Sequence, residues 1–261
     1  MGAGPGPVGD VVLDLAPLGP GVLAGFTSRA GGRSTGPWHG LNLGTLVGDD
    51  PDAVAANRAA LERRVGARLV FATQVHGADV AVVGRHDEGG VRADGLVTTS
   101  PDVALGVYVA DCAPVLLADP VAGVVAAAHA GRPGLVAGVL QATVAQMVRA
   151  GADPVRVVAA VGPCIAGSSY EVPEAMRDDV AAAVPEAASC TSAGTPGVDL
   201  ARGVAAVLRR CGIDVVHTDG RDTYADPALY SHRRAVHDGT GVTGRFAGVV
   251  RLLDAPRPPR G

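Results

Sequence analysis

The sequence predicts an α+β fold, a single domain in which mixed β-sheets are flanked by helices. Short apolar segments rich in Val, Leu and Ala and bounded by Gly or Pro, which are typical of strands, outnumber the segments with helical spacing. Several of these strand-like segments also follow one another directly, which favours mixed sheets over regular strand–helix alternation. The domain is expected to occupy residues 10–253, between a disordered start at 1–9 and a flexible tail at 254–261.

The expected strands are short, mostly apolar and closed by turn residues. The stretch 107–131 contains three of them in direct succession, and a polar residue closes each one. The segment 69–75 alternates between apolar and polar residues, as a half-buried strand does. The other expected strands are 11–15, 22–26, 80–83, 155–161, 213–217 and 246–253.

The expected helices begin at recognisable caps. The first begins at Pro51, because Asp50 before it is a good N-cap and proline fits the first helical turn, and it runs to about Val65. The segment 134–150 is apolar over most of its circumference, so we expect it to lie well inside the molecule. Further helices are expected at 173–184 and 199–210.

Composition argues against several classes of protein. Charged residues make up 18% of the 261 residues and the formal net charge is −4, so no basic surface for nucleic acid is expected. No signal peptide and no membrane-spanning apolar run are found in the sequence. The four cysteines are widely spaced, which favours free thiols or metal ligands over disulfides. We therefore expect a cytoplasmic protein without nucleic-acid or membrane partners, whose oligomeric state the sequence leaves open.

Three side chains with ligand chemistry follow predicted strands. His76 follows the segment 69–75, Cys112 closes the first strand of 107–131, and His129 closes the third. Two imidazoles and one thiolate fit a catalytic zinc site with an open fourth position, and they also suit copper. Without a metal, Cys112 with a nearby histidine as base is a candidate nucleophile. The residues alone leave these alternatives open.

The other cysteines and most other histidines are interpreted as structural or surface residues, because a buried cysteine usually behaves as a small hydrophobic side chain. They are Cys164, Cys190, Cys211, His39, His86, His217 and His237. Asp111, next to Cys112, has three open roles: it orients a ligand, moves a proton, or caps a turn.

Several ordered motifs resemble the YfiH-type family, which was named for a polyphenol oxidase (laccase) domain and later described as purine nucleoside phosphorylases. The longer motifs are Gln74-Val75-His76-Gly77, Ala110-Asp111-Cys112-Ala113-Pro114-Val115, Ala128-His129-Ala130-Gly131, Gly162-Pro163-Cys164-Ile165 and Tyr170-Glu171-Val172. The shorter ones are Thr27-Ser28-Arg29, Leu41-Asn42-Leu43-Gly44, Asn57-Arg58, Tyr230-Ser231-His232-Arg233-Arg234 and Thr243-Gly244-Arg245. Because these motifs occur in order over most of the chain, together they are far more specific than any one of them.

The resemblance implies an αββα-like domain and a metal-dependent enzyme. It implies phosphorolysis of adenosine, inosine, guanosine and methylthioadenosine, with adenosine deamination at the same site, so purine nucleosides and phosphate are the expected small-molecule partners. The implied metal is zinc, with copper as the alternative. The implied metal ligands are His76, Cys112 and His129, which with Arg58 would also be catalytic, and the implied substrate-binding residues are Ser28, Asn42, Arg58 and Arg233.

The chain departs from the family pattern at a few positions. Arg132 and Pro133 follow His129-Ala130-Gly131 where the family usually has Trp and Arg, which affects one wall of the pocket or the start of the next helix. Ser169 and Asp222 stand where cysteines often occur.

Three other functions compete with nucleoside phosphorolysis. A cysteine hydrolase or amidase acting on a cell-wall precursor would use Cys112 as nucleophile and His76 or His129 as base. A polyphenol oxidase would need copper, although seven histidines without a His-x-His pair argue against a trinuclear cluster. A zinc ion that only holds strands together would give a structural role without catalysis.

Overall fold

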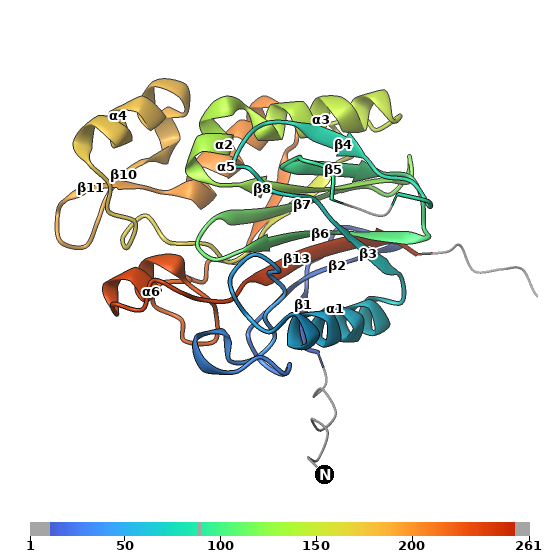
Figure 1. Ribbon diagram of the computed structural model, residues 1–261. Helices are drawn as coiled ribbons and strands as arrows, with labels where there is room; N and C mark the ends of the chain where they lie inside the picture. The colour runs from blue at the N-terminus through green and yellow to red at the C-terminus, as the bar shows by residue number, and fades with distance from the viewer. Residues whose placement is uncertain (1–10, 88–89, 254–261) are drawn as a thin grey trace, which may run out of the picture.

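The computed structural model describes residues 11–87 and 90–253, in which two β-sheets pack face to face between layers of helices (Figure 1). The sequence explains why. Every residue of β7 (Ala113–Asp119) and β8 (Val124–Ala130) is buried, and a strand buried on both faces must lie between two other layers. The expected α+β fold with αββα layers is therefore confirmed.

The first sheet has five strands and is covered by one helix. Its order is β1 (Leu13–Leu15), β2 (Val22–Thr27), β13 (Phe246–Leu252), β6 (Val103–Val109) and β3 (Arg68–Phe71), and only the β3–β6 pair is parallel. Helix α1 (Pro51–Val65) covers the outer face, where Leu61 shares an apolar cluster with Val249. As expected, the Asp50 side chain caps α1 by accepting a hydrogen bond from the backbone N–H of Asp52.

The second sheet has six strands and is covered by three helices. Its order is β12 (Val215–Thr218), β9 (Val158–Val161), β7, β8, β5 (Gly95–Thr98) and β4 (Val80–Val82). Helices α2 (Arg132–Ala137), α3 (Val139–Arg149) and α5 (Leu200–Arg210) cover its outer face, where Leu140 and Val207 belong to one core. A second core between the sheets includes Leu105 and Leu116.

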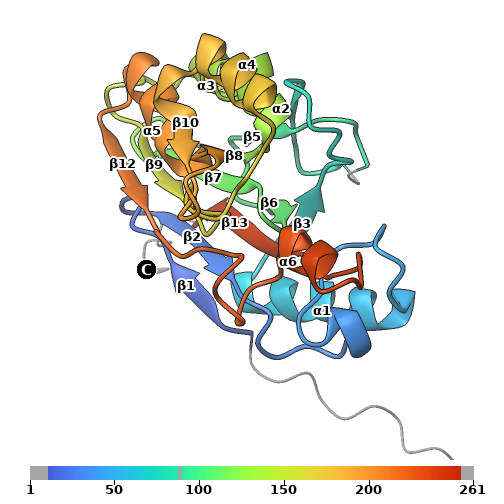
Figure 2. The ribbon, with the colours of Figure 1, turned by 90° about the vertical axis from the view of Figure 1, so that its left-hand side faces the viewer.

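One end of the two-sheet core carries additional small elements (Figure 2). Helix α4 (Glu174–Ala183) lies there with the hairpin of β10 (Ala188–Cys190) and β11 (Pro196–Val198), and the short helix α6 (His232–His237) lies below them in this view. Short 3₁₀ turns occur at Gly36–Trp38 and Pro185–Ala187. The sequence predicted neither the hairpin nor α6.

Two predicted elements are wrong in detail. The strand expected at 69–75 ends at Phe71, and Thr73 instead forms an isolated bridge with Arg92. The helix expected at 134–150 is two helices, because Gly138 adopts a φ of 91°, which ends α2 and precedes α3. Nor is α3 enclosed, since Val148 is 45% exposed. A helix on the outer face of a sheet contacts the core along one side only.

The predicted disordered start at 1–9 and flexible tail at 254–261 lie outside the described residues. Within 11–87 and 90–253, no helix is both long and apolar enough to cross a membrane. All four cysteines are free, as the sequence predicted.

Candidate metal centre and its cavity

The chain crosses from one sheet to the other at Asp111 and Cys112. The stretch 107–131 does form three successive strands, but β6 lies in the first sheet whereas β7 and β8 lie in the second, so the three are not all neighbours in one sheet. Ala113 at the start of β7 pairs with Ala130 at the end of β8. Because antiparallel pairing brings the start of one strand to the end of the other, Cys112 and His129 meet at one edge.

His76 reaches the same edge from the first sheet. Strand β3 runs parallel to β6, so both chains leave the sheet in the same direction. Beyond β3, the Gln74 side chain continues the pairing: its Nε2 donates to the Tyr108 carbonyl at 2.9 Å, and its Oε1 accepts from the Tyr108 N–H at 3.0 Å. Gln74 thereby holds the segment that carries His76 against the end of β6.

The structure brings His76, Cys112 and His129 together, and their ligand atoms all lie within 4.8 Å of one another. The sulfur of Cys112 lies 3.7 Å from His76 Nε2, and the two imidazole rings meet edge to face with centroids 4.7 Å apart. Ligand bonds of about 2.0–2.3 Å in a tetrahedral zinc site place ligand atoms about 3.3–3.8 Å apart. The three donors therefore fit such an ion after small adjustments, and they also suit copper.

Gly131 gives this cluster its room. A Cβ atom at this position would lie 2.8 Å from His76 Cδ2 and 2.9 Å from the Cys112 sulfur. Its φ of −76° is ordinary for any residue, so space and not backbone conformation requires glycine here. The small residue after β8 is thus part of the site.

Backbone strain is concentrated at the same place. Among the described residues, the non-glycine residues with positive φ are His76, at 59°, and Asp111, at 92°. Each such residue costs about 1–3 kcal/mol and persists only where its surroundings fix it. The carboxylate of Asp111 supplies part of that fixing, because it accepts hydrogen bonds from Thr223 Oγ1 at 2.7 Å and from the Arg233 N–H at 2.6 Å. The carboxylate thus fixes the backbone beside Cys112 through Thr223 and the start of α6, and among the described residues it bonds none of the side chains of His76, Cys112 and His129.

Asp94 organises two of the three donors, and the sequence analysis missed it. Its Oδ1 lies 2.8 Å from His129 Nδ1, and its carboxylate also accepts the backbone N–H groups of 75, 76 and 77 at 2.8–3.1 Å. With Nδ1 directed at Asp94, His129 has Nε2 available for a metal. Burial alone would raise the pKa of Asp94, but the bonds from His129 and from the backbone outweigh it and hold the pKa below its ordinary value.

The charges within the cluster support one another. Burial would raise the pKa of Cys112, but His129 and His76 outweigh that effect and lower it to about 6. Burial would lower the pKa of His129, whereas the Cys112 thiolate and Asp94 raise it to about 9. The metal-free site is therefore a thiolate–imidazolium pair near neutral pH, and the thiolate is the form of cysteine that binds metals and attacks carbon.

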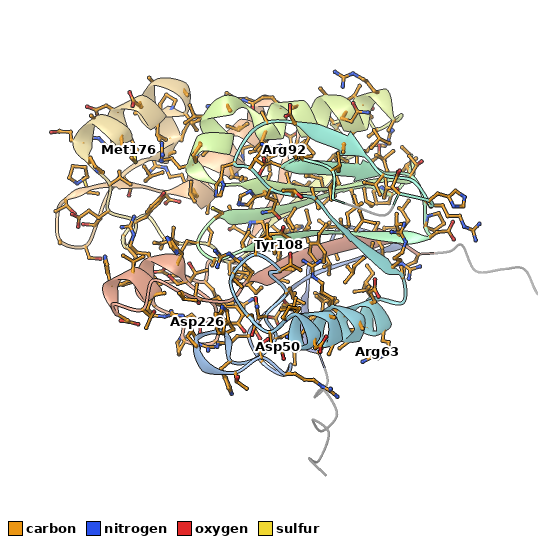
Figure 3. All side chains as sticks on the ribbon, in the orientation of Figure 1. Asp50, Arg63, Arg92, Tyr108, Met176 and Asp226 are labelled. Atoms are coloured by element: carbon orange, nitrogen blue, oxygen red, sulfur yellow. The ribbon has the colours of Figure 1, made fainter. Side chains whose placement is uncertain are left out.

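The cluster opens onto a cavity of about 510 Å³. Tyr108, which is near the centre of Figure 3, and Tyr170 supply aromatic surface in its wall. Arg132, Arg233 and Arg245 supply positive charge. Within the part of the chain that the structure describes, no ion pair joins these three arginines to a carboxylate. A cavity with aromatic walls and unpaired cations suits a flat, polar ligand together with an anion.

Comparison with known proteins shows the family. A family model described as multi-copper polyphenol oxidoreductase laccase matches residues 23–253. The chain belongs to this family. A Streptomyces coelicolor protein named purine nucleoside phosphorylase is 51% identical over 237 residues, which are 89% of this chain and 96% of that protein.

Solved structures of this laccase-like family share the fold. A Neisseria meningitidis protein of the DUF152 family is 35% identical with a TM-score of 0.84, over 94% of this chain and 100% of that chain. Bacillus licheniformis YfiH is 30% identical with a TM-score of 0.81, over 88% and 92% of the two chains. The resemblance to the YfiH-type family that the motifs indicated is confirmed.

Of the expected substrate-binding residues, Arg233 lines the cavity and the other three lie outside its lining. Ser28 accepts a hydrogen bond from the Ala30 N–H at 3.2 Å. The guanidinium carbon of Arg58 lies 4.6 Å from the centre of the Phe71 ring and 5.8 Å from the centre of the Tyr108 ring, and Tyr108 itself lines the cavity. Burial lowers the pKa of Arg58 below its ordinary value.

Asn42 is fully buried and holds two segments of the cavity wall. Its Oδ1 accepts the N–H groups of Gly44 at 3.0 Å and Arg245 at 2.8 Å, while its Nδ2 donates to Asp49 at 2.8 Å. Gly44 and Arg245 both line the cavity. The structure thus connects Asn42 to the cavity through the residues that it positions.

The departures from the family pattern have identifiable places. Arg132 is the first residue of α2 and lines the cavity, so a cation occupies the position of the usual Trp. Ser169 and Asp222 lie side by side, with Ser169 Oγ donating to Asp222 Oδ2 at 2.6 Å. The two residues that replace the family's frequent cysteines therefore contact each other through a hydrogen bond.

Proposed function

We propose that this protein is a metal-dependent purine nucleoside phosphorylase acting on adenosine, inosine, guanosine and methylthioadenosine, with adenosine deamination as a second activity of the same site. One observation carries the proposal: the cluster of His76, Cys112 and His129 opens onto a cavity whose arginines have no carboxylate partner among the described residues. The name of the Streptomyces coelicolor relative supports it.

Phosphorolysis requires one bond to form and one to break. A phosphate oxygen attacks the anomeric carbon of the sugar, the C–N glycosidic bond breaks, and its electron pair leaves with the purine. The products are the free base and a sugar 1-phosphate. Positive charge develops on the sugar during this step, and the negative charge of phosphate stabilises it. Arg233 and Arg58 are the cations assigned to phosphate in this proposal, Arg233 directly from the cavity wall.

The leaving purine must take up a proton or accept a hydrogen bond. The hydroxyl group of Tyr170, which lines the cavity, can donate. Burial raises the pKa of Tyr170 despite the nearby charges of Arg132 and Arg233, so its proton is retained at neutral pH.

His76, Cys112 and His129 would hold the metal ion, and Asp94 would orient His129. A bound zinc ion would supply Lewis acidity and would make water a usable nucleophile near neutral pH, which deamination needs. Copper would fit the same donors, and electron paramagnetic resonance of the purified protein separates the two metals.

The test is release of free base from adenosine and inosine, with and without phosphate, on protein of known metal content. Phosphate-dependent release of adenine or hypoxanthine that is lost in His76→Ala is the expected result. Cys112→Ala should abolish phosphorolysis and deamination together if one site serves both. No release from metal-loaded protein would contradict the proposal.

One observation favours a second candidate, a cysteine hydrolase or amidase acting on a cell-wall precursor. The lowered pKa of Cys112, which its two histidine neighbours cause against the effect of burial, produces a thiolate beside a base. Iodoacetamide labelling of Cys112 decides between the two. Labelling that zinc does not block favours the hydrolase, whereas full protection by zinc favours a metal site.

A further inference from the structure

Arg245 is a partly buried cation of the cavity wall that forms no ion pair with a carboxylate in the described chain. Its Nη1 donates to the carbonyl oxygens of Thr243 at 3.1 Å and Gly244 at 2.9 Å, which belong to its own loop. Burial lowers its pKa below the ordinary value. A carbonyl dipole orients a guanidinium group but does not neutralise it, and a charge withdrawn from water without a counter-ion is costly. An anionic ligand would supply that counter-ion.

The surrounding loop is built around this side chain. Asn42 accepts the Arg245 N–H at 2.8 Å, and the Leu43 N–H donates to the Arg245 carbonyl at 2.9 Å. A Cβ atom at Gly44 would lie 2.8 Å from Arg245 Cγ, so glycine at this position leaves space for the arginine stem. Arg58 also supports this loop, because its Nε donates to the Leu43 carbonyl at 2.9 Å. The side chain of Arg245 is therefore positioned before any ligand arrives.

The groups whose charges act on Arg245 are already engaged or neutral. They are Cys112, Asp111 and Tyr108. Cys112 belongs to the metal cluster, and both carboxylate oxygens of Asp111 accept hydrogen bonds from Thr223 and Arg233. Burial raises the pKa of Tyr108, so it stays neutral. No group in the described chain competes with a ligand for the guanidinium of Arg245.

We propose that Arg245 is the oxyanion subsite of the cavity and binds the phosphate group directly. The proposal rests on the proposed function and extends it, because phosphate is the second substrate of a phosphorylase. A planar guanidinium suits a tetrahedral oxyanion, since its parallel N–H groups can donate to two oxygens at once. The ligand is either inorganic phosphate or the 5′-phosphate of a nucleotide.

The experiment is isothermal titration calorimetry of the metal-loaded protein with inorganic phosphate, with AMP and with adenosine. In Arg245→Gln, affinity for phosphate should fall by about tenfold or more, as expected for the loss of a charge-assisted pair. A fall for inorganic phosphate identifies the free ion as ligand, and a fall for AMP alone identifies the ester. The same affinities in the variant and the natural protein, or no binding of either ligand to the natural protein, would overturn the subsite.

Two further variants guard against a misfolded Arg245→Gln. Gly44→Ala keeps the charge but pushes against the Arg245 stem, and it should also weaken phosphate binding. Arg149→Gln removes an exposed arginine of α3 that forms a hydrogen bond with Gln146, and phosphate affinity should be unchanged in this variant.

Base release on the same samples separates the two proposals. A natural protein that binds phosphate through Arg245 but releases no base refutes the function alone, whereas unchanged KM for phosphate in an active Arg245→Gln variant refutes the subsite alone.

Discussion

Asp94 Oδ1 lies 2.8 Å from Nδ1 of His129, and the same carboxylate accepts the backbone N–H group of His76 at 3.0 Å. One side chain thus fixes two donors that come from different parts of the chain. The pairing follows from topology. Gly95 pairs with Ala128 where β5 meets β8, so the residue before Gly95 lies beside the residue after Ala128. The backbone confirms this with a 2.7 Å bond from the His129 N–H to the Asp94 carbonyl.

Asp94→Asn should weaken metal binding by about 10–100-fold, as loss of a carboxylate behind a ligating histidine typically does. The amide cannot accept from His129 and from three backbone N–H groups as a carboxylate does. Competition with a chromogenic chelator measures the affinity. Asp102→Asn is the matched control, because Asp102 is exposed and, among the described residues, its partners are Ser100 and Arg85. Equal affinities in Asp94→Asn and the natural protein would show that Asp94 does not orient the site.

Gly131→Ala should reduce bound metal without unfolding the protein. Its new Cβ would approach the Cys112 sulfur to 2.9 Å and His76 to 2.8 Å, while the backbone conformation at 131 accepts alanine. Metal content per chain measures the occupancy of the site, and the far-ultraviolet circular dichroism spectrum shows whether the protein is folded. Gly123→Ala is the control for a glycine-to-alanine change away from the site, since nothing lies within 4 Å of a Cβ atom there. Its φ of 64° leads us to expect some loss of stability but no loss of metal. Full metal occupancy in Gly131→Ala would contradict the packing argument.

The Cys112 thiol of the metal-free protein should ionise as the pH rises through about 6, rather than near its ordinary value of about 8.5. The ultraviolet absorbance of the thiolate follows this, with Cys112→Ser providing the background of the other three cysteines. In His129→Gln the ionisation should move toward ordinary values, because the imidazolium that stabilises the thiolate is lost. A Cys112 pKa that is insensitive to this change would exclude the pair.

The same pair predicts how stability depends on pH. The lowered pKa of Cys112 contributes stability at alkaline pH, and this contribution is lost as pH falls through about 6. The raised pKa of His129 contributes stability at acid pH, and that contribution is lost as pH rises through about 9. Between these limits the two slopes oppose each other. We compare the free energy of unfolding in urea for the metal-free protein and for the Cys112→Ala, His129→Gln double variant. The difference between the two free energies should stay nearly constant between about pH 6.5 and about pH 8.5, which lie between the two pKa values.

Asn57→Ala should destabilise the protein by about 1–3 kcal/mol, because it leaves buried polar groups without partners. Asn57 is fully buried, accepts the Arg33 N–H at 2.8 Å, and donates to the Asn42 carbonyl at 2.9 Å. Urea unfolding gives the free energy, and hydrogen exchange should become faster in residues 33–44. In Asn57→Asp the bond from Arg33 can persist, but a buried carboxylate would face the carbonyl oxygens of Gly40 and Asn42, so this variant should be destabilised at least as much as Asn57→Ala. Exchange that stays slow in 33–44 would show that other contacts hold this loop.

Much of the fold follows from local patterns. Capping by Asp50 and Pro51 placed α1, and the run of apolar residues in 107–131 placed three strands, because caps, turns and hydrophobic periodicity act over a few residues. The predictions failed where longer-range contacts decide. The strand after residue 68 ends early because a side chain, Gln74, takes over the pairing with β6, and no periodicity reveals that exchange.

The sequence by itself determined the αββα family, through ordered motifs, and the three donors of the candidate metal centre, each at the end of an apolar run. Only the tertiary structure decided which polar residues support them. Asp94 is separated in sequence from the residues that it holds, and short-range signals carry no information about such partners. Antiparallel pairing of β5 with β8 brings Asp94 beside His129, and that contact exists only once the sheet has formed.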